Sequence, residues 1–227
     1  MNGGCELTND PASDWDYAVH WNYNDTKIPP LELCSTDKRV FNINCTSTRK
    51  DYTDKVFEDI FGYSIDADTH KIGRCIKKSV HQSTHDGVIV ETPCKKKKGF
   101  VYQKWIDNRI NKEWIRDIRV PIFDGTIPMI FIKDRVSTSM FITWTGKRVY
   151  SLDPAEKHLT AREAAKILEF SKAVGLDLGE LDVLRDNSTG LIYVIDVNDT
   201  PGGNVFKYIK GGWRLEKDLT RYMMSLL

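Results

Sequence analysis

Three side chains with oxygen donors near the end of the chain, Asp182, Asp196 and Asn198, have the types and spacing best suited to chemistry. Side chains alternate between the two faces of a strand, so Asp196 and Asn198 point to one face and Val197 to the other. A turn-forming segment between the two acids predicts a β-hairpin. If this hairpin centres on Thr189, Asp182 lies directly opposite Asp196, with the two Cβ atoms about 4.5–5.5 Å apart. The sequence therefore predicts that the three side chains converge on one patch.

Carboxylates held that close together repel each other unless a cation lies between them. Oxygen donors without histidine or cysteine favour Mg²⁺ or Mn²⁺, and Mg²⁺ commonly binds together with substrate phosphates. The alternative is an exposed hairpin face whose acids meet only water. Two features favour a metal site. Asp196 interrupts an apolar run, where an acid is a poor choice for a structural strand, and the strand ends in the turn Asn198–Gly203, which lets backbone approach a ligand closely.

The elements that would position these residues are two helices and a series of strands. Apolar residues recur at helical spacing over Asp51–Phe61, and Gly62 follows at the C-terminal capping position. A second helix is predicted over Thr160–Val174, because Thr160 and Glu163 can form a capping box. The predicted strands are Tyr17–Trp21, Val40–Ile43, Ile72–Ile76, Gly87–Val90, Phe100–Ile106, Ile115–Val120, Ile127–Lys133 and the hairpin pair Leu181–Leu184 and Leu191–Val197. Together they indicate an α+β fold with mostly antiparallel strands.

Length and composition narrow the class of protein. A chain of 227 residues is long enough for one medium domain or two small lobes with a sizeable core. The formal net charge of +1 disfavours a general nucleic-acid binder, which needs a strong positive surplus. The five cysteines are odd in number and form no C-x-x-C pair, which is typical of reduced thiols in a cytoplasmic protein. No run approaches the ~18 apolar residues of a membrane helix, so we expect no membrane partner.

The end of the chain resembles the ATP-grasp superfamily, specifically its RimK-type glutamate ligases and the related D-alanine–D-alanine ligases. In those enzymes an Asp-bearing strand is followed by a strand of pattern Asp/Glu-x-Asn-x-x-Pro-Gly, and the two strands hold magnesium. Here Asp182 matches the first acid, Asp196 and Asn198 match the second strand, and Pro201-Gly202 closes the pattern. The family more often has Glu at the position of Asp196. The resemblance implies an ATP-grasp fold, in which two α+β lobes with mostly antiparallel sheets sandwich ATP, and it implies that these three residues bind Mg²⁺.

The same resemblance implies which residues bind the nucleotide. Two lysines are expected to reach its phosphates, and Lys50 and Lys77 match them, with Lys55 as a weaker candidate for the first. The segment Val101–Asp107 resembles the strand whose backbone binds adenine and whose polar residue reads the base edge. Within it the expected nucleotide-binding residues are Gln103, Lys104, Trp105 and Ile106.

The resemblance also implies three further cationic residues beside the groups that react. The segment Arg116–Val120 resembles the Asp-Ile-Arg motif of RimK-type enzymes, and Ile132–Arg135 resembles their Met-Lys-Arg strand. The resemblance places Arg119, Lys133 and Arg135 near the transferred phosphoryl group or the acceptor carboxylate, where negative charge develops. The alternative for each is a solvated strand residue. The loop expected to cover the phosphates, residues 79–87, differs from the family in having a single glycine at its end.

The resemblance covers roughly residues 48–205 and divides the chain into residues 1–47, a shortened N-terminal segment, residues 48–100, the small lobe, and residues 101–227, the large lobe with the metal site. It implies an ATP- and Mg²⁺-dependent ligase that activates a small-molecule or peptide carboxylate as an acylphosphate for attack by an amine. Two alternatives remain open: a nucleotide-binding module whose catalysis is lost or depends on a partner, and an ATP-grasp kinase. The short N-terminal segment leaves room for an acceptor site completed by a second copy of the chain in a homo-oligomer.

Overall fold

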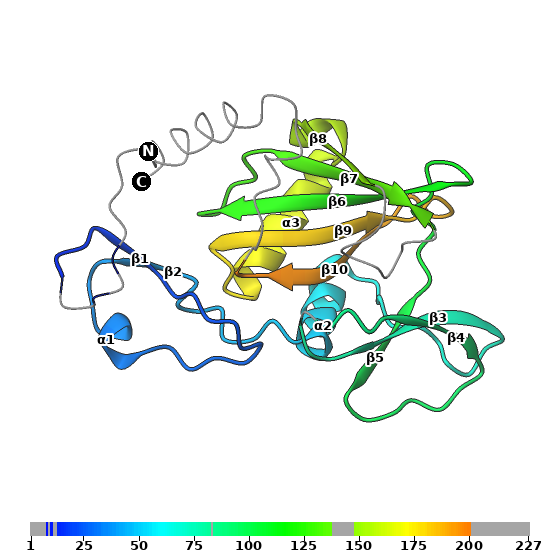
Figure 1. The fold of residues 1–227 in the computed structure, drawn as a ribbon, viewed down its shortest axis with the longest axis horizontal. Helices are drawn as coiled ribbons and strands as arrows, with labels where there is room; N and C mark the ends of the chain where they lie inside the picture. The colour runs from blue at the N-terminus through cyan, green and yellow to red at the C-terminus, as the bar shows by residue number, and fades with distance from the viewer. Residues whose placement is uncertain (1–7, 9, 11–12, 83, 138–147, 201–227) are drawn as a thin grey trace.

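Two antiparallel sheets dominate the computed structural model, which describes residues 8, 10, 13–82, 84–137 and 148–200. The smaller sheet has the order β4-β3-β5 and the larger one β10-β9-β6-β7-β8, and Figure 1 shows them as separate layers. The strands of the small sheet are β3 (Gly73–Ser79), β4 (Val88–Thr92) and β5 (Phe100–Lys104), and those of the large sheet are β6 (Trp114–Phe123), β7 (Ile130–Val136), β8 (Arg148–Asp153), β9 (Leu178–Arg185) and β10 (Ile192–Asn198). The predicted α+β class with mostly antiparallel strands is confirmed.

Both predicted helices are present, as α2 (Lys50–Phe61) and α3 (Ala161–Ala173). Helix α3 begins with the predicted capping box, in which the Thr160 hydroxyl accepts from the Glu163 N–H and the Glu163 carboxylate accepts from the Thr160 N–H. Helix α2 ends at Gly62, whose φ of 81° is the left-handed conformation that favours glycine. No helix in the described part of the chain is long and apolar enough to cross a membrane.

The first part of the chain folds into short elements at one end of the molecule (Figure 1). Strand β1 (Tyr17–Val19) pairs with β2 (Arg39–Phe41), and helix α1 (Leu31–Cys34) lies between them in sequence. The two strands coincide with predicted ones but pair in parallel, so they are the exception to the antiparallel rule. Neither α1 nor β8 was predicted from the sequence.

One cluster of buried apolar side chains joins the helices to the large sheet. Phe57 of α2 is fully buried, stacks on Tyr193 of β10 and meets Phe170 of α3 edge to face. Inward-facing residues alternate along the strands, as Ile118 and Val120 do on β6. Because this face of the large sheet is filled by the core, the alternate side chains point to the opposite face, where the pocket lies.

The N-terminal segment packs tightly against the turn between α3 and β9. Gly175 has a φ of 75°, and a Cβ there would lie 2.3 Å from the carbonyl oxygen of Asn44, so only glycine fits. Asn42 is fully buried, and its amide oxygen accepts from the N–H groups of Asp177 and Leu178, each at 2.9 Å. These contacts fix the segment against the start of β9.

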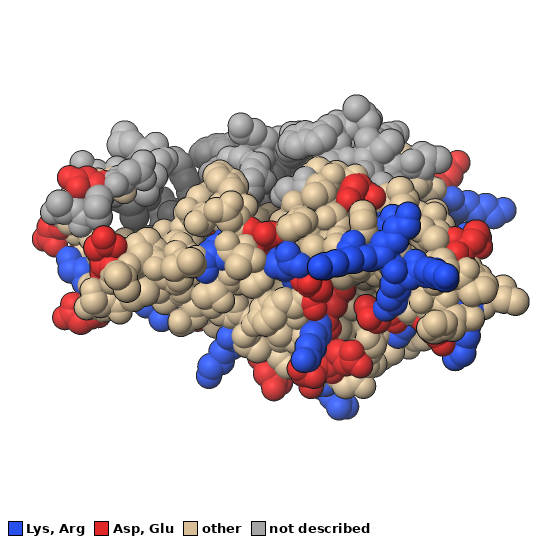
Figure 2. Space-filling model, turned by 90° about the horizontal axis from the view of Figure 1, so that it is seen from below, with Lys and Arg blue, Asp and Glu red and all other residues tan. Residues whose placement is uncertain are grey.

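Charges of both signs are distributed over the surface. Figure 2 shows basic and acidic side chains in adjoining groups on one face, in keeping with 33 Lys and Arg against 32 Asp and Glu.

Candidate active site

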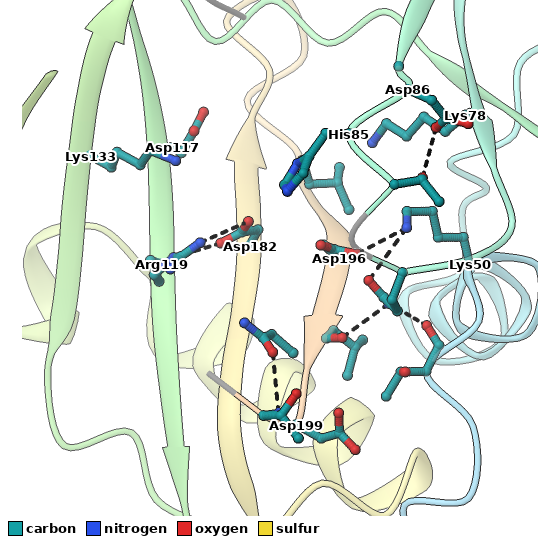
Figure 3. Close-up of a pocket in the computed structure, with 18 of the residues that line it drawn as sticks. Lys50, Lys78, His85, Asp86, Asp117, Arg119, Lys133, Asp182, Asp196 and Asp199 are labelled. Carbon is teal, nitrogen blue, oxygen red and sulfur yellow. Dashed lines mark hydrogen bonds and ion pairs between the residues drawn. The ribbon is translucent and has the colours of Figure 1, made fainter. Parts of the chain in front are cut away.

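A row of charged side chains crosses three strands of the large sheet. In the strand register Arg119 on β6 is opposite Asp182 on β9, and Asp182 is opposite Asp196 on β10. The predicted pairing of the two carboxylates is therefore confirmed. Figure 3 shows Arg119 pointing toward Asp182, and Asp196 facing Lys50, so the two neighbouring carboxylates lie between a cation on each side. All four of these residues, together with Asn198, line one pocket.

A β-bulge on β10 aims Asp196 into the pocket. Nearer the turn Val194 pairs with Val183, whereas beyond the bulge Val197 pairs with Leu181. Leu181 and Val183 lie on the core face of β9, so both valines face the core although they are three residues apart. The extra residue reverses the alternation, and Asp196 consequently faces the pocket.

The second part of the row lies on β6 and β7. Asp117, two residues before Arg119, is opposite Lys133. The Asp117 carboxylate forms an ion pair with Arg135, whose Nε lies 2.9 Å from Oδ2. Burial lowers the pKa of Lys133, an effect that the carboxylates of Asp117 and Asp182 oppose. The structure thus brings the three predicted cations into the pocket, with Asp117 between them.

Arg119 is held from two sides. Its Nε is 2.9 Å from Oδ1 of Asp182, and its Nη1 is 3.0 Å from Oε2 of Glu180. Burial alone would raise the pKa of Asp182, but the positive charges of Arg119 and Lys133 outweigh it and lower that pKa. Asp182 is consequently held as a carboxylate, the form that ligates a cation.

Asp196 has an oxygen that suits a cation. Its Oδ1 is buried and accepts no hydrogen bond within the described part of the chain. The Lys50 Nζ, at the start of α2, lies 3.5 Å away in an ion pair and donates at 2.8 Å to the carbonyl oxygen of His81. No group of three or more His, Cys, Asp and Glu side chains among the described residues is arranged to hold a metal. A metal here would thus depend on two carboxylates and the Asn198 amide, an all-oxygen donor set that fits Mg²⁺.

The loop at residues 79–87 lies over this side of the pocket and is held by side chains. The Asp86 carboxylate accepts from the Ser79 N–H at 3.1 Å and from the Thr84 hydroxyl at 2.9 Å. The Gln82 amide donates to the carbonyl oxygen of Val197 at 3.1 Å. These hydrogen bonds tie the loop to β10, which is how a sequence poor in glycine forms a defined loop here.

Lys78, rather than the predicted Lys77, faces the pocket. Neighbouring side chains on a strand point to opposite faces. Lys77 Nζ lies 4.0 Å from the ring centre of Phe100, outside the pocket, whereas Lys78 lines it. Burial lowers the pKa of Lys78, and the charge of Asp196 opposes that shift. The structure places Lys78, and not the predicted Lys77, at the pocket, and the binding of phosphates by a lysine of this strand stays a prediction.

The predicted adenine segment does not line this pocket. Gln103 is buried, and its Nε2 donates to both carboxylate oxygens of Asp54 at 2.9 Å. Lys104 donates to the Ser64 carbonyl. The side chain of Trp105 stacks with Arg74, and Ile106 joins the core. Their role in nucleotide binding stays a prediction.

The buried Asp54–Gln103 contact should make stability depend on pH. Burial raises the pKa of Asp54 from 3.8 to about 7, although the Gln103 hydrogen bond opposes the shift. A raised carboxyl pKa means that the folded state binds a proton more tightly, so the free energy of unfolding falls as pH rises from about 4 to 7. Asp54→Asn should remove a fall on the order of 2–4 kcal/mol, as measured by urea unfolding at pH 5 and pH 8. The exposed Asp59→Asn on the same helix is the control, and an unchanged pH dependence in Asp54→Asn would contradict the assignment.

Sequence reasoning missed several pocket residues: Tyr23, Thr48, Lys78, Asp117 and Asp199. Two of them carried a usable signal. Asp117 is two residues before Arg119 on one strand, and Asp199 directly follows Asn198. Lys78 is adjacent to the predicted Lys77, whereas Tyr23 and Thr48 come from segments that gave no such signal, and only the fold brings them to the pocket.

Solved structures of ATP-grasp ligases share this architecture. No family model matches the sequence, and no curated protein matches it. D-alanine–D-alanine ligase from Bacillus anthracis, complexed with ATP, is 17% identical, with a TM-score of 0.59 over 95% of this chain and 82% of that one. The ATP-grasp ligase PsnB, complexed with a minimal precursor, is 12% identical, with a TM-score of 0.58 over 86% of this chain. The chain has the ATP-grasp fold.

The chain spans 66% of the length of PsnB, just under two thirds. In the complex of PsnB with its minimal precursor, Mg and ADP, the TM-score is also 0.58, with 13% identity and coverage of 64% of that chain. The pocket of the present chain lies between β6, β7, β9 and β10 on one side and α2, β3 and the loop at residues 79–87 on the other.

Proposed function

We propose that this chain is an ATP- and Mg²⁺-dependent ligase that joins a carboxylate to an amine. The observation that carries the proposal is the pocket, where Asp182, Asp196 and Asn198 face the same space as five Lys and Arg side chains. A polyphosphate with bound metal has the complementary charges. A pocket for a neutral ligand does not require so many partly buried charges, each of which costs desolvation free energy.

Lys50 and Lys78 are proposed to bind the nucleotide phosphates. Asp182, Asp196 and Asn198 would hold Mg²⁺, or Mn²⁺ in its place, which would neutralise charge on the phosphates during transfer. The buried Oδ1 of Asp196 supports this assignment, since it has no hydrogen-bond donor in the described chain. Lys50 would then serve as the counterion of Asp196 until nucleotide binds.

Arg119, Lys133 and Arg135 are proposed to act on the reacting groups. The γ-phosphoryl group of ATP passes to the acceptor carboxylate, giving ADP and an acylphosphate. The amine then attacks the acyl carbon, phosphate leaves, and the nitrogen loses a proton to give an amide. Both steps place negative charge on phosphoryl or acyl oxygens, which fixed guanidinium and ammonium groups stabilise. Asp117 and Asp182 keep these cations in place before substrate binds.

The substrates proposed are a small-molecule or peptide carboxylate and an amine. PsnB is described in complex with a precursor peptide, and the B. anthracis enzyme is a D-alanine–D-alanine ligase. Within the superfamily the RimK-type branch is proposed, because Asp117, Arg119 and Lys133, from the two segments that resemble RimK-type motifs, all line the pocket. A cytoplasmic location, which free Cys34, Cys45, Cys75 and Cys94 favour, would supply ATP and Mg²⁺.

Substrate-dependent release of ADP tests the proposal. The protein is incubated with Mg·ATP and mixtures of carboxylates and amines, and hydroxylamine is added to trap an acylphosphate as a hydroxamate. A ligase gives ADP, phosphate and an amide in equal amounts. A stable phosphorylated product without amide would instead identify a kinase. Nucleotide binding without ADP release from any mixture would favour a binding module, which the loop poor in glycine also suggests.

A further inference from the structure

The N-terminal segment touches both sides of the pocket through two residues that are two positions apart. The Asp25 carboxylate is hydrogen-bonded to the ring of His81, with Oδ2 and Nδ1 2.7 Å apart, in the loop at residues 79–87. Lys27 forms an ion pair with Asp199, the residue that follows Asn198. One short stretch therefore contacts the loop on the small-sheet side and the end of β10 on the large sheet.

The contact of Lys27 lies at the base of the proposed metal site. The Lys27 side chain is fully buried, and that of Asp199 is 6% exposed. Asp199 also lines the pocket, and its carbonyl oxygen accepts a hydrogen bond from the Asn42 amide at 3.3 Å. A Cβ at Gly179 would lie 2.5 Å from the carbonyl oxygen of Asn198, so the backbone there has little room to move. The end of β10 is thus fixed from several sides, and Lys27 supplies the only full charge opposite Asp199 among the ion pairs of the described residues.

The contact of Asp25 lies beside the proposed phosphate site. The backbone oxygen of Asp25 accepts from the Thr48 N–H at 2.9 Å, and the Lys27 N–H donates to the Thr46 carbonyl at 2.8 Å. This pairing fixes the stretch against the residues that lead into α2 and Lys50. The carbonyl oxygen of Thr48 in turn accepts from the Gln82 amide. Asp25 therefore belongs to the same hydrogen-bonded unit as the loop and Lys50.

We propose that residues 25–27 form a clasp, in which Asp25 positions the loop at residues 79–87 and Lys27 positions the metal-binding end of β10. The inference rests on the proposed function and deepens it. It gives a role at the site to a segment that precedes residues 48–205, the part whose sequence resembles ATP-grasp enzymes. Asp25 and Lys27 are positioning residues, because they act through His81 and Asp199 and not on the reacting atoms.

A purely structural role makes a different prediction. A buried ion pair is often replaceable by apolar side chains without loss of stability, although removal of one partner leaves a costly charge. If the clasp only stabilises the fold, its variants should lower the unfolding temperature and leave the Mg²⁺ dependence of nucleotide binding unchanged. If it positions the site, they should weaken binding of Mg·ATP more than binding of ATP without metal.

Two measurements on the full chain test the clasp. The first is calorimetric titration with ATP in two buffers, one containing Mg²⁺ and one containing EDTA, and the second is the unfolding temperature. Lys27→Met should weaken Mg·ATP binding about 10–100-fold, as loss of a residue that orients metal ligands typically does, and Lys27→Arg should restore part of it. Asp25→Asn should weaken ATP binding in both buffers, because it frees the phosphate loop. The exposed substitutions Lys112→Met and Asp37→Asn are matched controls.

The outcomes separate the clasp from the proposed function. If the wild-type protein binds no nucleotide, the proposed function fails. If the wild type binds Mg·ATP and folded Lys27→Met and Asp25→Asn bind it equally well, the clasp is overturned and the proposed function stands. If Lys27→Met does not fold, Asp199→Asn removes the same charge pair at constant size, and wild-type affinity in that variant would overturn the role of Lys27.

Discussion

Replacement of Asp196 by Asn should weaken Mg²⁺-dependent ATP binding about 100-fold, because a charged ligand contributes roughly 3 kcal/mol and each 1.4 kcal/mol is tenfold. The carboxylate faces the pocket, its Oδ1 is buried without a hydrogen-bond donor in the described chain, and Lys50 is its ion-pair partner. Asn keeps the size of the side chain but lacks the charge that a divalent cation requires. Calorimetric titration with Mg·ATP measures the loss, and titration in EDTA should show a much smaller difference.

The matched control for this prediction is Asp59→Asn, the same substitution at an exposed position on α2. It should bind Mg·ATP like the wild type. The two variants should also unfold at similar temperatures, since the relief of repulsion between Asp196 and Asp182 offsets the loss of the ion pair with Lys50. Equal affinity of Asp196→Asn and wild type for Mg·ATP would show that Asp196 is no metal ligand.

Replacement of Lys78 by Met should weaken ATP binding about 10–100-fold, which corresponds to the loss of a hydrogen bond between charged groups. The expected loss persists in EDTA, because Lys78 would contact the phosphates themselves. Lys77→Met is the matched control one residue away, on the face of β3 that points to Phe100. Fluorescence titration with a nucleotide analogue can rank the two variants and the wild type.

The same two variants compare the lysine predicted from the sequence, Lys77, with the lysine that lines the pocket, Lys78. From the structure we expect the Lys77 variant to bind nucleotide like the wild type and the Lys78 variant to bind it poorly. The reverse order would mean that the small sheet presents its other face to the nucleotide. Equal losses in both variants would point to a general effect on β3 instead of a phosphate contact.

The hairpin was predictable because its signals are local. A turn-forming segment between two apolar runs sets the pairing, and alternation then assigns Asp196 and Asn198 to one face. Near the turn, however, Ile192 pairs with Arg185, one residue out of register with a hairpin centred on Thr189. The bulge before Asp196 removes this offset, so Asp196 does pair with Asp182 as predicted. The pairing depends on the bulge, which the alternation of side chains along a strand does not predict.

The missed features depend on contacts between distant segments. Lys27 and Asp199 are far apart in sequence, and nothing near either residue indicates that they form a buried ion pair. Lys77 and Lys78 are adjacent on one strand and therefore point to opposite faces. Which of them faces the pocket is decided by the packing of the small sheet, which the sequence of the strand does not show. Gln103 was predicted to read a base, yet Asp54 of α2 occupies its amide. Strand β8, with the sequence RVYSLD, lies at the edge of the large sheet and has neither a continuous apolar run nor a regular alternation that would predict a strand.

Direct calorimetric titration of the wild-type chain with ATP tests whether this pocket binds a nucleotide through a divalent cation. We expect saturable binding of one ATP per chain with Mg²⁺ present, and at least tenfold weaker binding when EDTA removes the metal. Absence of binding at millimolar nucleotide, or equal affinity with and without Mg²⁺, would contradict it.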